Sequence, residues 1–374
     1  MGQLVYRNQS EMRRGYTTGT CAAAAAQAAA LLLLTGKAPQ EVRHITPSGV
    51  ALSLTPEQTC LEQDAAVCAI RKDSGDDPDV TNGIRIFARV EKRPSGIEIA
   101  GGTGVGRVTK PGLACAVGKA AINPGPRAQI IAALEAAAAG CGYPGGFAVT
   151  ISAENGEAIA EQTYNAHLGV LGGISILGTS GIVEPMSEAA LMETTHLELD
   201  SLLAQGQRIA FLCPGNYGAD FGRDTLGLDL EQAVKCSNFI GDALDYAAWK
   251  GFPEILLVGH AGKLVKLAAG VMNTHSSVAD GRQEVFTAHA ALCGASKPVL
   301  EQLMQAISVD ACIAILDEAG LREPVMQHIA AAIEQKLRLR LRGRANIQYI
   351  MFTSRYGLLA QSAGAEELCE KLRK

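Results

Sequence analysis

Apolar and polar positions in the first part of the chain favour short strands that follow one long helix. Residues 18–34 form a nearly unbroken apolar stretch behind a run of hydroxyl residues, which predicts a helix with a side-chain cap. The predicted strands cover 41–45, 50–54, 64–71, 84–92, 96–100 and 147–152, and a second helix covers 125–139. Strands clustered after one helix indicate an α+β domain with an antiparallel or mixed sheet.

The pattern changes near residue 165, where apolar strands begin to alternate with long helices. Three strands each run into a Gly-rich turn and then a helix, which indicates right-handed βαβ crossovers and a parallel, Rossmann-like sheet. These units are 173–177 with the turn 178–181 and a helix from Ser187, 208–213 with the turn 214–218 and a helix over 229–249, and 254–258 with the turn 259–262 and a helix over 263–271. Helices over 283–294, 297–307 and 323–337 and a strand over 346–352 complete the prediction.

The length of 374 residues exceeds the size of one ordinary core. We therefore expect a chain of α/β and α+β type with two domains. An α+β domain covers residues 1–165, and a Rossmann-like parallel-sheet domain covers residues 166–374.

The composition indicates a globular chain of the reducing cytoplasm. Hydrophobic residues make up 48% of the chain and charged residues 19%. The 10 cysteines stand singly, without a C-x-x-C pair, so neither a zinc site nor a disulfide framework is indicated. A net charge of -5 argues against a nucleic-acid partner, which calls for a basic excess.

The apolar stretch behind Arg13 and Arg14 imitates a secretory signal peptide. It is mostly alanine, however, and Thr35-Gly36-Lys37 is a poor cleavage site. It is also too short to span a membrane, which takes roughly 20 apolar residues. We expect a buried, closely packed helix and no membrane segment.

The segment from Arg14 to Cys21 gathers hydroxyl groups and free backbone N–H groups at the start of the first predicted helix. Such a helix start can bind a carboxylate or a phosphate. The alternative is a plain N-cap without a ligand.

A loop over residues 72–79 packs four carboxylates behind Lys72. Acidic clusters can bind metals or accept protons. The alternative to such a site is a solvated turn without a function. The spacing is not that of an EF-hand, and we expect no bound metal.

The segment 101–110 is rich in glycine and carries Arg107 and Lys110. Backbone amides exposed by glycines beside two cations can grip an anionic group. The pattern is weak evidence, because turns alone produce it and the full dinucleotide fingerprint is absent.

The segment Gly259-His260-Ala261-Gly262-Lys263 invites comparison with a nucleotide P-loop. The comparison fails, because the spacing differs and Leu264 stands where a magnesium-binding hydroxyl belongs. His260 follows a predicted parallel strand and is a candidate for acid–base chemistry, with a structural histidine as the alternative. His275 and His289 lie nearby in sequence, but the separations do not favour a metal triad.

The basic run over residues 336–344 could suggest a nucleic-acid patch. Cations at the end of a helix before a glycine offset the helix dipole, and we interpret the run as a helix C-terminus.

Taken together, these segments resemble the CbiD family, the cobalt-precorrin-5B C1-methyltransferases of anaerobic cobalamin synthesis. The resemblance covers nearly the whole chain, with the last part weakly marked. It rests on residues 14–21, 72–81, 101–112, 121–127, 173–187, 237–241, 259–266, 273–276 and 279–282.

The resemblance implies a Rossmann-like domain beside an α+β domain, S-adenosylmethionine as methyl donor and a cobalt-bound precorrin with acetate and propionate arms as acceptor. The reaction adds a methyl group to cobalt-precorrin-5B and gives cobalt-precorrin-6A. Cobalt arrives with the substrate, so the protein itself needs no metal. A homo-oligomer is left open.

On this basis we assign candidate site residues to three roles. For S-adenosylmethionine they are Gly178, Thr179, Ser180, Gly181, Gly215, Asn216, Gly218, Gly259, Gly262 and Lys263. For the substrate they are Arg14, Thr17, Thr18, Gly19, Thr20, Lys72, Asp76, Arg107, Lys110 and Arg127, and all of these except Asp76 are expected to bind its carboxylate arms. Asp77 and His260 are the candidates for moving a proton.

Two alternatives remain at this stage. A phosphate- or nucleotide-using enzyme would explain the Gly-Lys loop and would bind ATP with magnesium. A non-catalytic corrinoid-binding protein would hold the macrocycle without affinity for a methyl donor.

Overall fold

The computed structural model describes residues 4–7 and 9–373. The chain divides into two compact units, Met1–Ser187 and Glu188–Lys374. The division falls after Ser187 and not after residue 165, because two short strands beyond residue 165 pair within the first unit. They are β12 (Val170–Leu171), which pairs with β10 (Arg107–Val108), and β13 (Ile182–Val183), which pairs with β3 (Gly15–Tyr16).

The first unit is built on a five-stranded mixed sheet. Neighbouring strands are antiparallel except β11 and β9, which are parallel. Side chains along β8 and β11 alternate between buried and partly exposed positions, as expected of a sheet covered on one face. The strands in their order across the sheet are β6 (Glu57–Leu61), β7 (Ala65–Arg71), β8 (Arg85–Arg93), β11 (Gly146–Ala153) and β9 (Ile97–Gly101).

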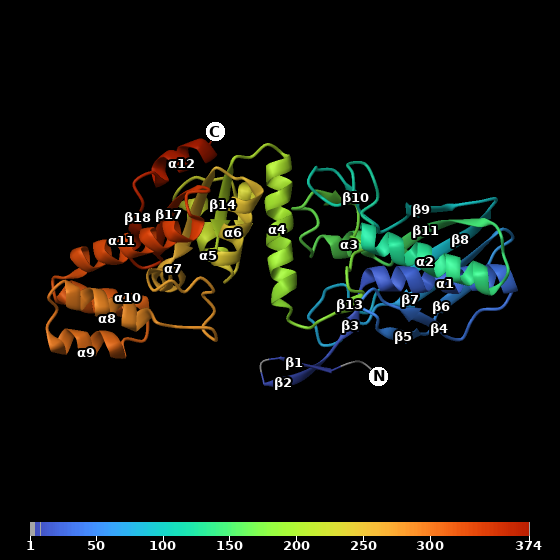
Figure 1. Ribbon diagram of the computed structural model, residues 1–374, viewed down its shortest axis with the longest axis horizontal. Helices are drawn as coiled ribbons and strands as arrows, with labels where there is room; N and C mark the ends of the chain where they lie inside the picture. The colour runs from blue at the N-terminus through green and yellow to red at the C-terminus, as the bar shows by residue number, and fades with distance from the viewer. Residues whose placement is uncertain (1–3, 8, 374) are drawn as a thin grey trace. The chain divides into compact units, whose positions relative to one another are not determined.

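Helix α1 (Thr18–Thr35) covers this sheet and is the apolar helix that the sequence predicts. It packs against β7, β8 and α2 (Pro124–Gly140), as Figure 1 shows. Among the described residues α1 is the one helix long and apolar enough to cross a membrane, so the expectation that the stretch is too short is wrong, but 72% of it is buried. Alanine side chains add little bulk and let the helix lie close to its neighbours, so the predicted core helix is confirmed.

Shorter elements complete the first unit. The predicted strand over 173–177 is wrong, because only single bridges join Ile174 to Val105 and Ile176 to Ile122. The remaining elements are β1 (Leu4–Arg7), β2 (Ser10–Arg13), β4 (Val42–Ile45), β5 (Ala51–Leu54) and α3 (Gly156–Ala160).

The second unit has a five-stranded mixed sheet of its own. Four strands are parallel, and the edge strand β18 is antiparallel to β17. The strands in their order are β15 (Ala233–Lys235), β14 (Ile209–Cys213), β16 (Glu254–His260), β17 (Asn346–Thr353) and β18 (Gly357–Gln361).

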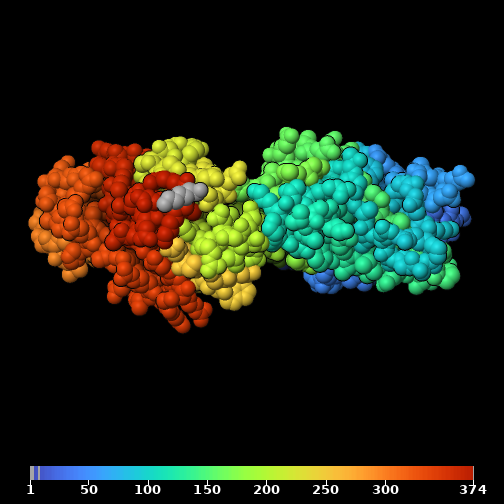
Figure 2. Space-filling model, turned by 90° about the horizontal axis from the view of Figure 1, so that it is seen from above, coloured from blue at the N-terminus to red at the C-terminus, as the bar shows by residue number. Residues whose placement is uncertain are grey.

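Helices cover both faces of this sheet. Ala210 and Leu212 of β14 join one core, whereas Phe211 and Cys213 join another, so successive side chains face opposite layers. Figures 1 and 2 both show α8, α9 and α10 gathered at one end of this unit. The helices are α4 (Glu188–Ala204), α5 (Asn216–Asp224), α6 (Ile240–Lys250), α7 (Ala261–Ala268), α8 (Arg282–Leu292), α9 (Lys297–Gln305), α10 (Val309–Glu318), α11 (Arg322–Leu341) and α12 (Ala365–Leu372).

The predicted helix over 229–249 is wrong in its first half. A short 3-10 turn (Leu230–Gln232) leads into strand β15, and helix α6 begins only at Ile240. Ser237 interrupts the chain between them with a φ of 51°, a left-handed conformation that a helix does not contain. Residues 233–235 therefore form a strand paired with β14, although their sequence pattern favours a helix.

Candidate functional site

Three parallel strands of the second unit end together at one edge of the sheet. After β14 the chain turns at Gly215, after β15 at Ser237, and after β16 directly into α7. The first two turns touch, because Cys236 N donates a hydrogen bond to Cys213 O at 3.1 Å. Open α/β sheets bind ligands at this edge, so the three turns form the candidate site.

Lys263 lies at the meeting point of these turns. Its Nζ donates to Ser237 O at 3.1 Å and lies 3.5 Å from where a β-carbon on Gly215 would stand. Burial lowers the pKa of Lys263, and the charge of Lys266 lowers it further. A half-buried ammonium group among loop amides is suited to an anionic ligand group.

The glycines in the turns after β14 and β16 differ in the space that surrounds them. A β-carbon on Gly218 would lie 2.5 Å from Val258 O, and one on Gly259 would lie 2.9 Å from the Pro214 ring. These two glycines therefore allow close packing of backbone rather than contact with a ligand. Gly215 has a φ of 107° and open space apart from the Lys263 ammonium, and Asn216 beside it is exposed.

His260 ends β16 and caps helix α7. Its Nδ1 accepts a hydrogen bond from Gly262 N at 3.1 Å, so the neutral ring carries its proton on Nε2. Burial lowers the pKa of His260, and the carboxylate of Asp310 opposes this shift. The ring is thus suited to donate a hydrogen bond through Nε2, and less suited to take up a proton.

The start of helix α1 is closed by the chain itself. Thr20 N donates to Thr17 Oγ1 at 3.2 Å, and Gly19 N donates to Leu177 O at 3.0 Å. The four residues of this helix start, Thr17, Thr18, Gly19 and Thr20, are buried. The plain N-cap is therefore the better interpretation of this motif, because the helix start is buried and the Gly19 and Thr20 amides are already bonded.

The turn over residues 178–181 belongs to this cap and not to the parallel sheet. A β-carbon on Gly178 would lie 2.3 Å from Thr17 Oγ1, and Thr20 Oγ1 donates to Gly181 O at 2.8 Å. The expectation that Gly178, Thr179, Ser180 and Gly181 follow a strand of the second unit is corrected. Gly178 and Gly181 pack against the cap of α1, so this turn does not join the cofactor site of the second unit.

The acidic loop over residues 72–79 is held by ion pairs and backbone bonds. Lys72 is 3% exposed and pairs with Asp79 at 2.5 Å, so the expectation that it binds the substrate arms is wrong. Asp76 accepts a hydrogen bond from Arg13 N, and Asp77 Oδ1 accepts one from Met186 N at 2.9 Å. Among the described residues no group of three or more metal-ligating side chains is found, here or elsewhere.

Besides Lys72, the four other candidate arginines and lysines of the first unit differ in accessibility. Arg107 is exposed, and its side chain donates to Gly118 O at 3.3 Å. Lys110 is half-buried beside Gly169, and Arg14 pairs with Glu184 at 2.6 Å. Arg127 donates to Ile122 O and Ile99 O and ties its helix to the sheet. Arg107 and Lys110 are thus the cations best placed for a ligand in solution.

The candidate site residues leave out Lys266, Asn238 and Thr274, which join the loops of the second unit, although all three lie in segments that carry the family resemblance. Lys266 Nζ donates to Thr274 O at 3.1 Å, and Thr274 N donates to Asn238 O at 2.9 Å. One available signal was the spacing of Lys263 and Lys266, which places both on neighbouring turns of a helix.

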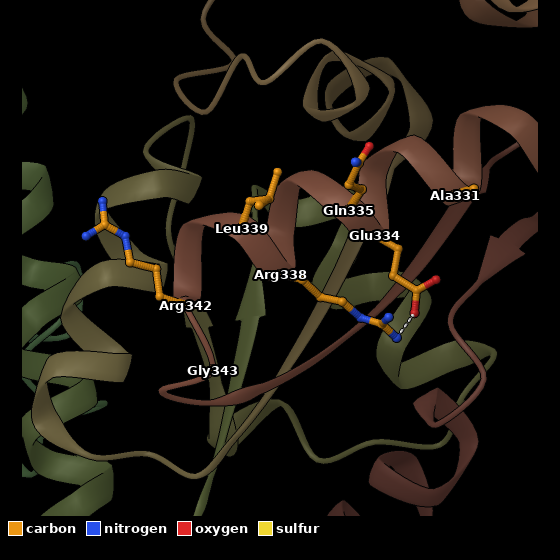
Figure 3. A pocket seen from close by; sticks show the side chains of 7 residues that line it. All are labelled: Ala331, Glu334, Gln335, Arg338, Leu339, Arg342 and Gly343. Atoms are coloured by element: carbon orange, nitrogen blue, oxygen red, sulfur yellow. Dashed lines mark hydrogen bonds and ion pairs between the residues drawn. The ribbon is translucent and has the colours of Figure 1, made fainter.

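A separate hollow of about 510 Å³ lies along helix α11 (Figure 3). Its lining residues, among them Glu334, Arg338 and Arg342, come from the basic C-terminal end of this helix. None of the candidate site residues lines it. We place the site by its chemistry, at the strand ends, and not in this hollow.

Comparison with known proteins gives consistent matches over the chain. A family model described as CbiD matches residues 5–185, and one described as CbiD, C-terminal domain, matches residues 273–363. A protein of Ruminiclostridium cellulolyticum named cobalt-precorrin-5B C(1)-methyltransferase is 50% identical over 353 residues, covering 94% of this chain and 92% of the relative. Relatives of the same name from Photorhabdus laumondii (43% identical, covering 99% of this chain and 98% of the relative) and Alkaliphilus metalliredigens (41%, covering 100% and 98%) also match.

A crystal structure titled cobalamin biosynthesis protein (cbiD), from Archaeoglobus fulgidus, also matches. It is 30% identical, covers 75% of this chain and 87% of that chain, and has a TM-score of 0.41.

Proposed function

The chain belongs to the CbiD family, and from this premise we propose that it methylates C1 of cobalt-precorrin-5B in anaerobic cobalamin biosynthesis. The observation that carries the proposal is a 50% identical relative of that name, matched over 94% of this chain. The methyl donor is S-adenosylmethionine, whose sulfonium supplies an already activated methyl group. The product is cobalt-precorrin-6A, and the enzyme acts in the cytoplasm without nucleic acid or membrane as partner.

The second unit is a Rossmann-like domain that holds S-adenosylmethionine. Four parallel strands with cores on both faces support this assignment. The turns at Gly215–Gly218 and Gly259–Lys263 fit the cofactor, because Gly215 leaves its backbone open and Lys263 offers a cation for the carboxylate.

The first unit holds the macrocycle by its carboxylate arms. Arg107 and Lys110 are the accessible cations that support this, and a carboxylate bound by an arginine forms a strong, charge-assisted pair. Arg14 remains a candidate for the same arms and Asp76 a candidate for the substrate, whereas Lys72 and Arg127 act inside the unit.

Catalysis then depends on alignment, since displacement at a sulfonium carbon needs a fixed geometry and the exclusion of water. Asp77 and His260 are the candidates for handling a proton. With Nδ1 accepting from Gly262, the neutral ring of His260 would contribute a hydrogen bond from Nε2, and only the protonated ring could transfer a proton from that atom.

Titration calorimetry tests the donor assignment against both alternatives. We expect S-adenosylmethionine to bind and ATP with magnesium not to bind. Affinity for ATP with magnesium alone would favour a nucleotide-using enzyme. A chain that holds a cobalt-precorrin but shows no affinity for S-adenosylmethionine would be a corrinoid-binding protein.

A further inference from the structure

Lys266 is a buried charge that the proposed reaction does not yet use. Its side chain is on helix α7 and the residue is 3% exposed. The ammonium group donates to Thr274 O at 3.1 Å and to Ala279 O at 2.8 Å, and lies 3.9 Å from Asp280 Oδ1. A buried cation is costly unless it is well bonded, so these contacts fix the segment that provides the carbonyls.

That segment covers residues 272–281, between α7 and α8, and has no regular structure. Its beginning is bonded to the turn after β15 and to the start of α6: Thr274 N donates to Asn238 O at 2.9 Å, and Gly241 N donates to Met272 O at 3.0 Å. The segment therefore lies beside the strand ends that form the candidate site.

Helix α7 holds two loops of the site through lysines three residues apart. Lys263 bonds to Ser237 in the turn after β15, and Lys266 bonds to the segment 272–281. The segment offers the exposed side chain of His275, whose Nδ1 accepts from Ser277 N at 3.2 Å. The neutral ring of His275 therefore has an N–H at Nε2 that can donate to a ligand.

We propose that the segment 272–281 forms one wall of the S-adenosylmethionine site and that Lys266 is the positioning residue that holds it. The inference rests on the proposed function, which places the cofactor at these strand ends. Lys266 acts through the carbonyls of Thr274 and Ala279 and does not itself touch the cofactor.

The test compares Lys266→Met with the wild type in the full chain. Methionine keeps the apolar stem and removes the donors, and Asp280 keeps its partner Arg282. We expect hydrogen exchange in 272–281 to become faster, the Kd for S-adenosylmethionine to rise about tenfold, and kcat at saturating donor to change little. Lys371→Met is the matched control, because Lys371 pairs with Glu254 at the other end of β16 and should leave donor binding unchanged.

Asn238→Ala provides a second variant if Lys266→Met does not fold. It removes the bond between Asn238 Oδ1 and Thr274 Oγ1 without disturbing a buried charge, and should also weaken donor binding. A folded Lys266→Met or Asn238→Ala chain with faster exchange in 272–281 but wild-type affinity would overturn the inference alone. A wild-type chain without donor affinity would overturn the proposed function, and the inference with it.

Discussion

Lys263 donates to the carbonyl of Ser237, and its ammonium group lies 3.5 Å from where a β-carbon on Gly215 would stand. The sequence predicts both Gly215 and Lys263 as site residues, because glycine turns and a cation at strand ends are visible in the pattern. It could not separate Gly215 from Gly218, since only the structure shows that Gly218 packs against Val258. Nor could it show that Lys72 is buried and forms an ion pair with Asp79, because burial depends on how distant segments pack.

Gly215→Ala tests whether the open backbone at this turn receives the cofactor. Alanine at a φ of 107° should lower the free energy of unfolding by about 1–2 kcal/mol, and its methyl group should reduce affinity for S-adenosylmethionine. Gly251→Ala is the control, because Gly251 has a φ of 92° and open space at the end of α6. Calorimetry should show reduced donor affinity for Gly215→Ala alone; equal affinity in the two variants would argue against a ligand at Gly215.

Arg107→Ala tests the macrocycle surface of the first unit. Loss of one charge-assisted hydrogen bond should raise the KM for the cobalt-precorrin about tenfold and leave the Kd for S-adenosylmethionine unchanged. Arg89→Ala, which removes a cation paired with Glu62 and Glu91 on the same unit, should alter neither value. Equal weakening of both ligands by Arg107→Ala would contradict the assignment.

At the scale of helices and strands, the local sequence pattern predicts most of the elements that the structure contains. Helices α1, α2 and α11 and strands β7, β8 and β16 lie close to their expected positions, because each has a long periodic or apolar run. The failures occur where a tertiary partner decides. Strand β15 replaces a predicted helix because it pairs with β14, and residues 173–177 form only isolated bridges within the first unit.

Helix α4 protects the exposed edge of β15 through two side chains one turn apart. Thr195 Oγ1 donates to Lys235 O at 3.3 Å, and Glu198 accepts from the backbone of Lys235. Glu198 is 5% exposed, and burial raises its pKa to about 7 from an ordinary value of 4.5. Folding therefore favours the protonated form of the Glu198 carboxyl relative to the unfolded chain.

This shift predicts a pH-dependent stability. Below about pH 4.5 Glu198 is protonated in both states, but between about pH 4.5 and 7 only the unfolded chain ionises it. The free energy of unfolding should therefore fall by up to about 3 kcal/mol as the pH rises through this window. Denaturant titrations of wild type and Glu198→Gln between about pH 5 and 7 measure the effect. The Glu198→Gln variant should lack this fall in the free energy of unfolding. Parallel pH profiles of the two proteins would refute the raised pKa of Glu198.

At the scale of the whole molecule, each unit has its own sheet and its own core. The sequence predicts two domains of different construction, because the spacing of strands and helices changes along the chain. It places the change at residue 165, since the pairing of β12 and β13 back into the first unit leaves no local signal. The family resemblance, carried by many short motifs together, is confirmed by the matches over most of the chain.

Hydrogen exchange with and without S-adenosylmethionine tests which unit holds the donor. Protection should appear at 213–218, 236–241 and 259–266 of the second unit, where strand ends and loop amides gather. The cap of α1 and the turn 178–181 should exchange as in the free chain, because their hydrogen bonds join residues within the first unit. Protection confined to the first unit would reverse the assignment.

Methyl transfer itself is the direct test of the central claim. The chain is incubated with cobalt-precorrin-5B and S-adenosylmethionine labelled in its methyl group, and the corrinoid product is analysed by mass spectrometry. The account predicts a single labelled methyl group on the macrocycle, bound at C1. A corrinoid recovered without label, from a chain that binds both compounds, would contradict it.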